Sequence, residues 1–143
     1  MEKILNYING ALVEPTDNSF LDNYNPSIGK VYSQIPDSNE RDVDLAYSAA
    51  NEAFPSWSAT PKEERSKIMM RIADLIEENL EELAKAESMD NGKPVKLATQ
   101  VDIPRAASNM RFFATAILHY ASESHDMDGV AINYTLRKPI GVV

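Results

Sequence analysis

The longest regular pattern in the chain lies between Thr60 and Pro94. Apolar residues recur there at intervals of three and four, which places them on one side of a helix, with charged residues on the other side. The pattern predicts an amphipathic helical stretch that buries one face. The residues expected on that face are Ile68, Ile72, Leu75, Ile76, Leu80, Leu83 and Ala84.

Both ends of this stretch carry helix signals. The Thr60 side chain can cap the amide three residues later, and Pro61 suits the first helical position because its missing N–H is not needed there. At the other end, Gly92 can adopt the left-handed conformation, and Pro94 cannot continue a helix.

A single helix of about thirty residues would be unusually long for a globular domain. Asn79, followed by Glu82, can cap a new helix and so interrupt the stretch. We therefore expect one helix over Pro61–Glu78 and a second over Leu80–Met89.

Two β-hairpins are expected before these helices. Asn9-Gly10 suits a type I′ turn, and the segment Asn25–Gly29 combines an Asx turn, a proline and a glycine for positive φ. The expected strands are Ile4–Ile8 with Ala11–Val13, and Phe20–Tyr24 with Lys30–Ile35.

Further helices and a terminal strand complete an α+β order of elements. Pro55 is expected to end the first helix, whose inner face would carry Val43, Ala46, Tyr47, Ala50 and Phe54, and Trp57 to fill the joint that follows. Val130–Leu136 alternates apolar and polar residues, as a one-sided strand does. The remaining expected segments are a helix from Ser38 or Asn39 to Phe54, helices Val95–Gln100 and Asp102–Ala121, a loop Ser122–Gly129, and the beginning of a strand at Ile140–Val143. The buried face of the last helix is expected to carry Ala107, Met110, Phe113, Ala114, Ile117 and Leu118.

Composition limits the classes of partner. The chain has 143 residues, of which 43% are hydrophobic and 25% charged, as in ordinary globular domains. A net charge of −8 with scattered Lys and Arg argues against nucleic acids and anionic membranes as partners. No apolar run approaches the length of a membrane span, and the first ten residues lack the apolar core of a signal peptide, so we expect a cytoplasmic protein. The absence of cysteine excludes disulfides, thiolate metal sites and thiol nucleophiles within the chain.

Few residues indicate chemistry by their pattern alone. Ser122, Ser124, His125 and Asp126 include the residue types of a hydrolase triad, but they share one loop without a nucleophile-elbow glycine pattern. His125 and Asp126, together with Asp128, could also touch a metal ion, but a solvated acidic loop is the better explanation of these residues.

Two residues have charges that their positions disfavour. Arg105 is a cation in the first turn of a helix, so it either binds an anionic partner, or extends to water or pairs with a local carboxylate. Asp90 is a carboxylate at a helix C-terminus, where free carbonyls collect, so it is either a ligand for Na⁺ or K⁺ or an ordinary turn residue.

Several segments, in this order along the chain, resemble the N-terminal part of the NAD(P)-dependent aldehyde dehydrogenase family. They are YINGALVEP, NPSIGKVYSQIP, the long stretch from DVDLAYSAANEAF to ESMDNGKP, and YTLRKPIGVV. AFPSWS, the AES-D-GK arrangement and DIPR followed by RFFA resemble the branch that oxidises 2-aminomuconate and 2-hydroxymuconate semialdehydes. The resemblance implies an α/β family fold, of which this portion is the α+β part with hairpins, a helical bundle and a C-terminal β-arm.

The resemblance also implies a division of roles. Residues 1–125 would belong to the cofactor-binding domain and 126–143 to the start of the oligomerisation arm, with the rest of the cofactor domain and the catalytic domain absent. The family uses a cysteine thiolate to attack the aldehyde and transfers the hydride to NAD. Because the chain has no cysteine, we expect no catalytic residue and no activity in these 143 residues alone, and only poor NAD binding.

Specific residues follow from the resemblance as well. The family's monovalent-cation site uses backbone oxygens at the positions of Asn23 and Tyr24 and the aspartate at the position of Asp90, which implies a Na⁺ or K⁺ site here. In the semialdehyde branch, the arginine at the position of Arg105 resembles a clamp for the substrate carboxylate. Strands within 130–143 would join subunits into a homo-oligomer, and the alternative function is a non-catalytic assembly module that pairs with itself or a longer homologue.

Overall fold

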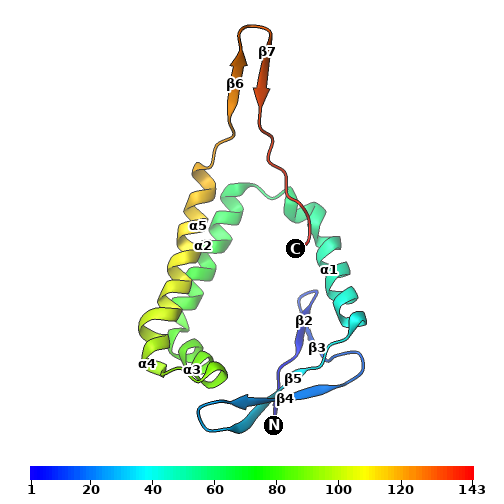
Figure 1. The fold of residues 1–143 in the computed structure, drawn as a ribbon, viewed down its shortest axis with the longest axis vertical. Coiled ribbons are helices and arrows are strands. Elements are labelled where there is room, and N and C mark those ends of the chain that lie inside the picture. Colours follow the sequence, from blue (N-terminus) through cyan, green and yellow to red (C-terminus); the bar gives the residue numbers. More distant parts are fainter.

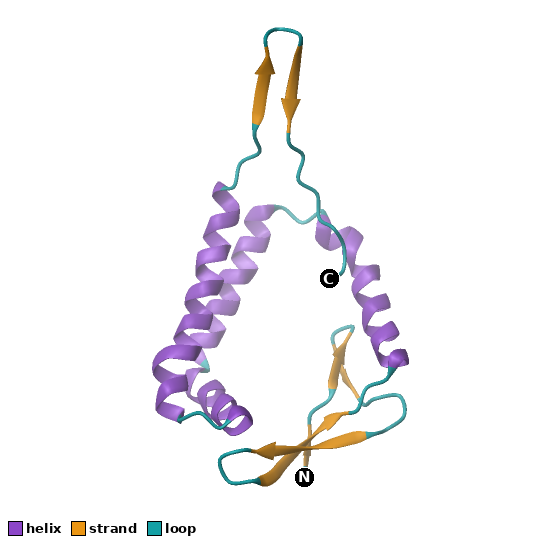
Figure 2. Cartoon of the chain, in the orientation of Figure 1, coloured by secondary structure: helices purple, strands orange, loops and turns teal.

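The computed structural model describes residues 1–143, as small sheets and long helices arranged around an open centre (Figures 1 and 2). The α+β order of elements is confirmed. The helices are α1 Glu40–Ser58, α2 Lys62–Glu78, α3 Leu80–Asn91, α4 Val95–Leu97, the π-helix η1 Ala98–Asp102 and α5 Ile103–His119. The strands are β1 Glu2–Lys3, β2 Asn6–Ile8, β3 Ala11–Val13, β4 Phe20–Asn25, β5 Lys30–Pro36, β6 Ser124–Met127 and β7 Ala131–Tyr134.

Both N-terminal hairpins form where the turn residues predict them. Asn9 and Gly10 have φ values of 52° and 79°, as the turn between β2 and β3 requires. In the turn between β4 and β5, the Ser27 N–H donates to Asn25 Oδ1 at 3.0 Å, and Gly29 has a φ of 65°. The sequence did not predict β1, which pairs in parallel with β5.

Helix α1 is capped by Asn39, one of the two expected starting residues, but does not end at Pro55. The Asn39 side chain accepts the N–H groups of Arg41 and Asp42, and Asp42 Oδ2 accepts the Asn39 N–H at 2.9 Å. The prediction that Pro55 ends the helix is wrong, because this proline lies in the last turn and removes only one backbone hydrogen bond. Trp57 accordingly belongs to α1 and is half-exposed rather than filling a joint.

The break at Asn79 and the left-handed end at Gly92 are confirmed, but both predicted caps are wrong. Thr60 Oγ1 donates to the Ser56 carbonyl at the end of α1, and Pro61 occupies the cap position of α2. The Asn79 side chain donates back to the Leu75 carbonyl at 2.8 Å, so it closes α2 instead of opening α3. Both side chains therefore hydrogen-bond to the end of the preceding helix and not to the start of the following one.

The π-helix η1, a single π-turn, joins the short helix α4 to α5, where we expected two separate helices. Lys93 fixes this corner, because its Nζ lies 2.8 Å from Asp102 Oδ2 and 2.9 Å from Glu87 Oε1. Hydrogen bonds to Asp102 and then Glu87 raise the pKa of Lys93. These two ion pairs fix the direction of α5 relative to α3.

The C-terminal region forms a hairpin that projects beyond the helices (Figure 1). The predicted strand at Val130–Leu136 is present as β7, but the predicted loop at Ser122–Gly129 is wrong because β6 forms within it and pairs with β7. Ile140–Val143, where a strand was expected to begin, pairs with no strand of this chain, so that expectation stays a prediction.

The helices contact each other mainly through small residues. Ala84, Ala107 and Ala114 lie on faces that were predicted to be buried, whereas Ala73 was not predicted. Helices α2 and α5 lie side by side, and Ala73, Ala107 and Ala114 between them are fully buried. The expected face of α2 is only half-covered, with Ile68 46% and Leu75 41% exposed, and Tyr47 on α1 is 56% exposed. No helix has both the length and the apolar composition that a bilayer crossing requires.

Candidate functional site

A hydrogen-bonded cluster joins the β4–β5 hairpin to the end of α3. Asp90 Oδ1 accepts a hydrogen bond from the Tyr32 hydroxyl at 2.9 Å and another from Asn23 Nδ2 at 3.3 Å. Asn23 Nδ2 also lies 2.9 Å from the Tyr32 oxygen and 3.2 Å from Ser33 Oγ. The structure therefore brings together Asn23 and Asp90, two of the three residues expected at the cation site.

A β-bulge aims the tyrosine at this carboxylate. Asn23 pairs with Ser33, whereas Tyr24 pairs with Val31, so Tyr32 is the extra residue in β5. Burial, and after it the hydrogen bond to Asp90, raises the pKa of the Tyr32 hydroxyl. The hydroxyl stays protonated at neutral pH and remains a donor. Sequence reasoning missed this residue because neither strand carries a signal for the bulge.

Close packing between the hairpin turn and Gly92 holds the cluster in place. Gly92 has a φ of 80°, and a Cβ built on it would lie 2.9 Å from Pro26 Cγ. Ser27 Oγ donates to the Gly92 carbonyl at 3.3 Å. Only glycine satisfies both the backbone conformation and the close approach.

The available atoms at this cluster suit a hard monovalent cation. Asp90 supplies a carboxylate, and only its Oδ1 is used in the hydrogen bonds described above. A hollow of about 440 Å³ borders the cluster and is lined by Tyr32, Ser33 and Asp90 among others. Tyr24 is 55% exposed and contributes no side-chain contact to Asp90, so its part in such a site is limited to its backbone oxygen. Oxygen ligands of this kind fit Na⁺ or K⁺.

Arg105 lies apart from this cluster. It is exposed in the first turn of α5, directly after the π-turn, and its guanidinium donates no hydrogen bond. Ile103 lines the hollow beside Asp90, and Arg105 points about 200° around the helix from it. Arg105 therefore faces a different region from the candidate cation site.

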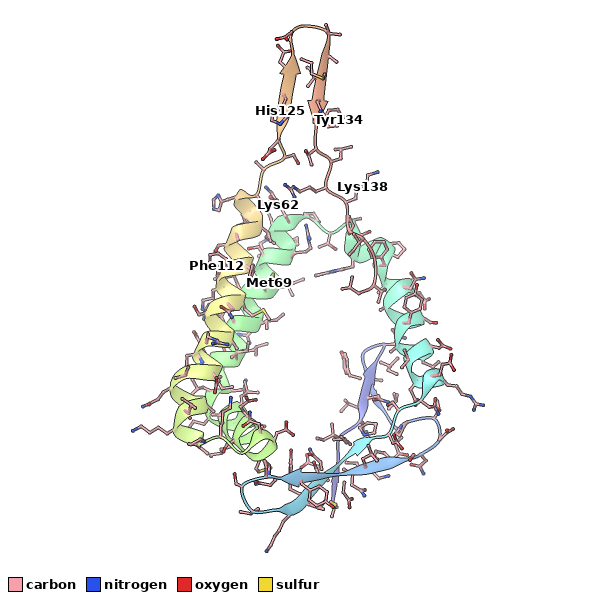
Figure 3. All side chains as sticks on the ribbon, in the orientation of Figure 1. Lys62, Met69, Phe112, His125, Tyr134 and Lys138 are labelled. Atoms are coloured by element: carbon pink, nitrogen blue, oxygen red, sulfur yellow. The ribbon has the colours of Figure 1, made fainter.

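The residues of the acidic loop do not form a catalytic or metal-binding group. His125 lies on the projecting hairpin (Figure 3), where its Nε2 is 3.9 Å from Glu123 Oε2. Asp126 Oδ1 accepts the Gly129 N–H in the turn of that hairpin. No group of three or more His, Cys, Asp or Glu side chains is arranged to hold a metal ion.

Comparison with known proteins is consistent across sequence and structure. The model of the aldehyde dehydrogenase family matches residues 12–143. The chain is 47% identical to the 2-aminomuconic semialdehyde dehydrogenase of Bos taurus and 46% identical to that of Homo sapiens, in each case over 138 residues and 96% of this chain. It spans 28% of the length of these relatives.

Solved structures show the same fold. The crystal structure of PnpE in complex with nicotinamide adenine dinucleotide superposes with a TM-score of 0.91 at 36% identity, covering 98% of this chain and 28% of that one. The NAD⁺ complex of an aldehyde dehydrogenase from Bacillus cereus gives a TM-score of 0.88 at 34% identity, covering 93% and 28%. The hairpins, helices and arm are thus the N-terminal part of that fold.

Proposed function

This chain belongs to the aldehyde dehydrogenase family, and we propose that it forms the N-terminal part of an NAD-dependent enzyme that oxidises a carboxylate-bearing semialdehyde to the acid. The observation that carries this proposal is the similarity over 96% of the chain to 2-aminomuconic semialdehyde dehydrogenases. Candidate substrates are 2-aminomuconate and 2-hydroxymuconate semialdehydes. Since the 143 residues contain no cysteine, the attacking thiolate has to come from polypeptide outside them.

We assign Arg105 the role of binding the substrate's carboxylate. Its guanidinium is exposed and donates no hydrogen bond within the chain, so all its donors are available. The π-turn at Ala98–Asp102 rotates α5 relative to the preceding helix, and such turns are frequent at functional sites. A guanidinium binds a carboxylate through two parallel hydrogen bonds, which would select an acidic semialdehyde over a neutral aldehyde.

Kinetics of a full-length family enzyme that carries these residues would test this role. We expect Arg105→Ala to raise the KM for the acidic semialdehyde about tenfold or more, while the KM for a neutral aldehyde changes less than twofold. Arg105→Lys should recover only part of the loss, since lysine keeps the charge but not the planar fork. Arg41→Ala, which removes an exposed arginine from α1, is the matched control. Equal effects on both substrates would exclude the carboxylate clamp.

For the cluster at Asp90 we propose a Na⁺ or K⁺ site that includes backbone oxygens of Asn23 and Tyr24. Its support is that a hydrogen bond from Asn23 Nδ2 to Asp90 Oδ1 brings these two residues together, beside a carboxylate of the kind that hard cations prefer. The expected result is that K⁺ or Na⁺ raises the melting temperature at constant ionic strength, and that Asp90→Asn abolishes the increase. Asp44→Asn, at an exposed position of α1, should leave it intact. If adding K⁺ or Na⁺ does not change the melting temperature of the full-length enzyme, the site is refuted.

We also propose that residues 1–125 belong to the cofactor-binding domain and that 126–143 begin an oligomerisation arm. The arm is supported by the projecting hairpin, on which Val130 is 88%, Ile132 72% and Leu136 67% exposed. The same surface favours the second candidate function, an assembly module without catalysis. Measuring NADH formation and molar mass in solution separates the two: turnover requires the enzyme, whereas a stable oligomer without turnover supports the module.

A further inference from the structure

Three positive side chains meet where the C-terminal segment crosses the junction between α1 and α2. Arg65 comes from the first turn of α2, whereas Arg137 and Lys138 follow β7. Figure 1 shows the C-terminal segment returning across this junction, and Figure 3 marks Lys138 on it. The three cations line a hollow of about 340 Å³ together with Phe54, Trp57, Ser58, Pro139 and Gly141, and no carboxylate lines it.

The guanidinium of Arg65 is left without an acceptor in this hollow. Its Nε is buried and has no hydrogen-bond partner. Buried donors are almost always paired, and a charged one is costly to leave unpaired. Two other partly buried cations, Lys93 and Arg111, each contact two carboxylates. The first turn of a helix adds a further penalty for the cation of Arg65.

The second arginine is already held in position beside the hollow. The guanidinium carbon of Arg137 lies 4.4 Å from the centre of the Tyr120 ring, a cation–π contact that fixes the side chain. Neither Arg137 nor Lys138 forms an ion pair. Three positive charges without a counterion therefore surround one small hollow, although the chain as a whole has a net charge of −8. This arrangement favours the binding of an anion.

We propose that this hollow binds a small oxyanion with two negative charges, of which inorganic phosphate is the simplest example. A guanidinium presents a planar fork of donors that matches oxyanion geometry, and the lysine adds a point charge. The bound anion would satisfy Arg65 and connect the C-terminal segment to α2. This inference does not depend on the oxidation of aldehydes.

The single tryptophan of the chain makes the site directly observable, because Trp57 lines the hollow. Titrating the 143-residue chain with sodium phosphate at pH 7.5, with sodium chloride holding the ionic strength constant, should change the Trp57 fluorescence saturably. We expect Arg65→Gln and Lys138→Gln each to weaken phosphate binding about tenfold or more. Arg71→Gln, which removes a surface arginine of the same helix, should leave binding unchanged. Acetate, with one charge, should bind at least about tenfold more weakly than phosphate.

Three results would overturn the proposal. They are a fluorescence change that chloride reproduces, a titration that Arg65→Gln and Lys138→Gln leave unaltered, and equal affinities for acetate and phosphate. Far-UV circular dichroism of each variant separates a lost site from a lost fold. If Arg65→Gln unfolds the chain, Lys138→Gln decides alone, because Lys138 is exposed in an irregular segment and forms no ion pair.

Discussion

Gly92 is the position where one added methyl group most directly tests how the Asp90 cluster is held together. Its φ of 80° disfavours any residue with a Cβ, which costs about 1–2 kcal/mol. The new Cβ would also lie 2.9 Å from Pro26 Cγ, which is part of a ring and cannot rotate away. Overpacking of this kind costs about 1–3 kcal/mol. We therefore expect Gly92→Ala to lower the free energy of unfolding by about 2–5 kcal/mol.

Gly10→Ala is the matched control for the backbone term. Gly10 has nearly the same φ, 79°, but a Cβ there meets no atom within 4 Å, so only the conformational cost of about 1–2 kcal/mol remains. Urea unfolding followed by far-UV circular dichroism measures both variants, and their difference is the packing term. In a Pro26→Ala background the nearest ring atom is gone and Cβ of residue 26 lies 3.5 Å away, an ordinary contact. The cost of Gly92→Ala should then fall to that of Gly10→Ala.

The Tyr32 hydroxyl provides a second readout, at the site itself. Its pKa is raised by burial and by Asp90, so displacing the hairpin turn from α3 should return the pKa toward its ordinary value of 10.0. An NMR titration of Tyr32 in wild type and in Gly92→Ala follows this change. Suppose that Gly92→Ala lowers the free energy of unfolding no more than Gly10→Ala does and leaves the pKa of Tyr32 unchanged. The turn then does not pack on α3, and this contact does not hold the proposed cation site in place.

Three further perturbations test the helices. Asn39→Ala removes the cap of α1 and should lower the free energy of unfolding by about 1 kcal/mol in urea denaturation. The N–H of Asn39, and to a lesser extent that of Thr16, lowers the pKa of Asp42, so the stability it contributes is present above about pH 3.8 and is lost as the pH falls through the folded value. Acid unfolding of Asp42→Asn should therefore show a weaker pH dependence than wild type. Arg111→Met, which breaks the ion pairs that join α5 to Asp74 and Glu77 of α2, should lower the urea midpoint slightly, and 1 M NaCl should reduce the difference from wild type.

Local conformational preferences account for the elements that the sequence predicted correctly. Asn9-Gly10 and Gly92 require positive φ, and that requirement acts within a few residues. The hydrogen bonds of Thr60 and Asn79 were harder to predict. A polar side chain between two helices can hydrogen-bond to the end of one or to the start of the other with similar chemistry. Which bond forms depends on the angle between the helices, and that angle is set by distant packing.

The candidate site could be predicted only in part, for a related reason. Asn23 and Asp90 are 67 positions apart, and no periodicity connects them, so family resemblance and not spacing identified the pair. Tyr32 was missed because it reaches Asp90 only through a bulge, whose extra residue depends on the register between β4 and β5. Arg105 could be located in its helical turn from the sequence, but the π-turn that orients it could not.

The apolar faces show most clearly what a hydrophobic pattern can and cannot reveal. The spacing of Ile68, Ile72 and Leu75 predicts a buried face, yet within this chain α5 covers α2 on another side, where Ala73 lies. The face predicted for α5 did include the buried Ala107 and Ala114, whereas Ala73 of α2 was missed because a small residue adds little to a hydrophobic pattern. Exposed apolar surface of this extent requires a partner. Since the chain spans 28% of its relatives' length, the remaining polypeptide of such an enzyme is the cover that fits the proposed function, and self-association through the same faces is what the assembly alternative demands.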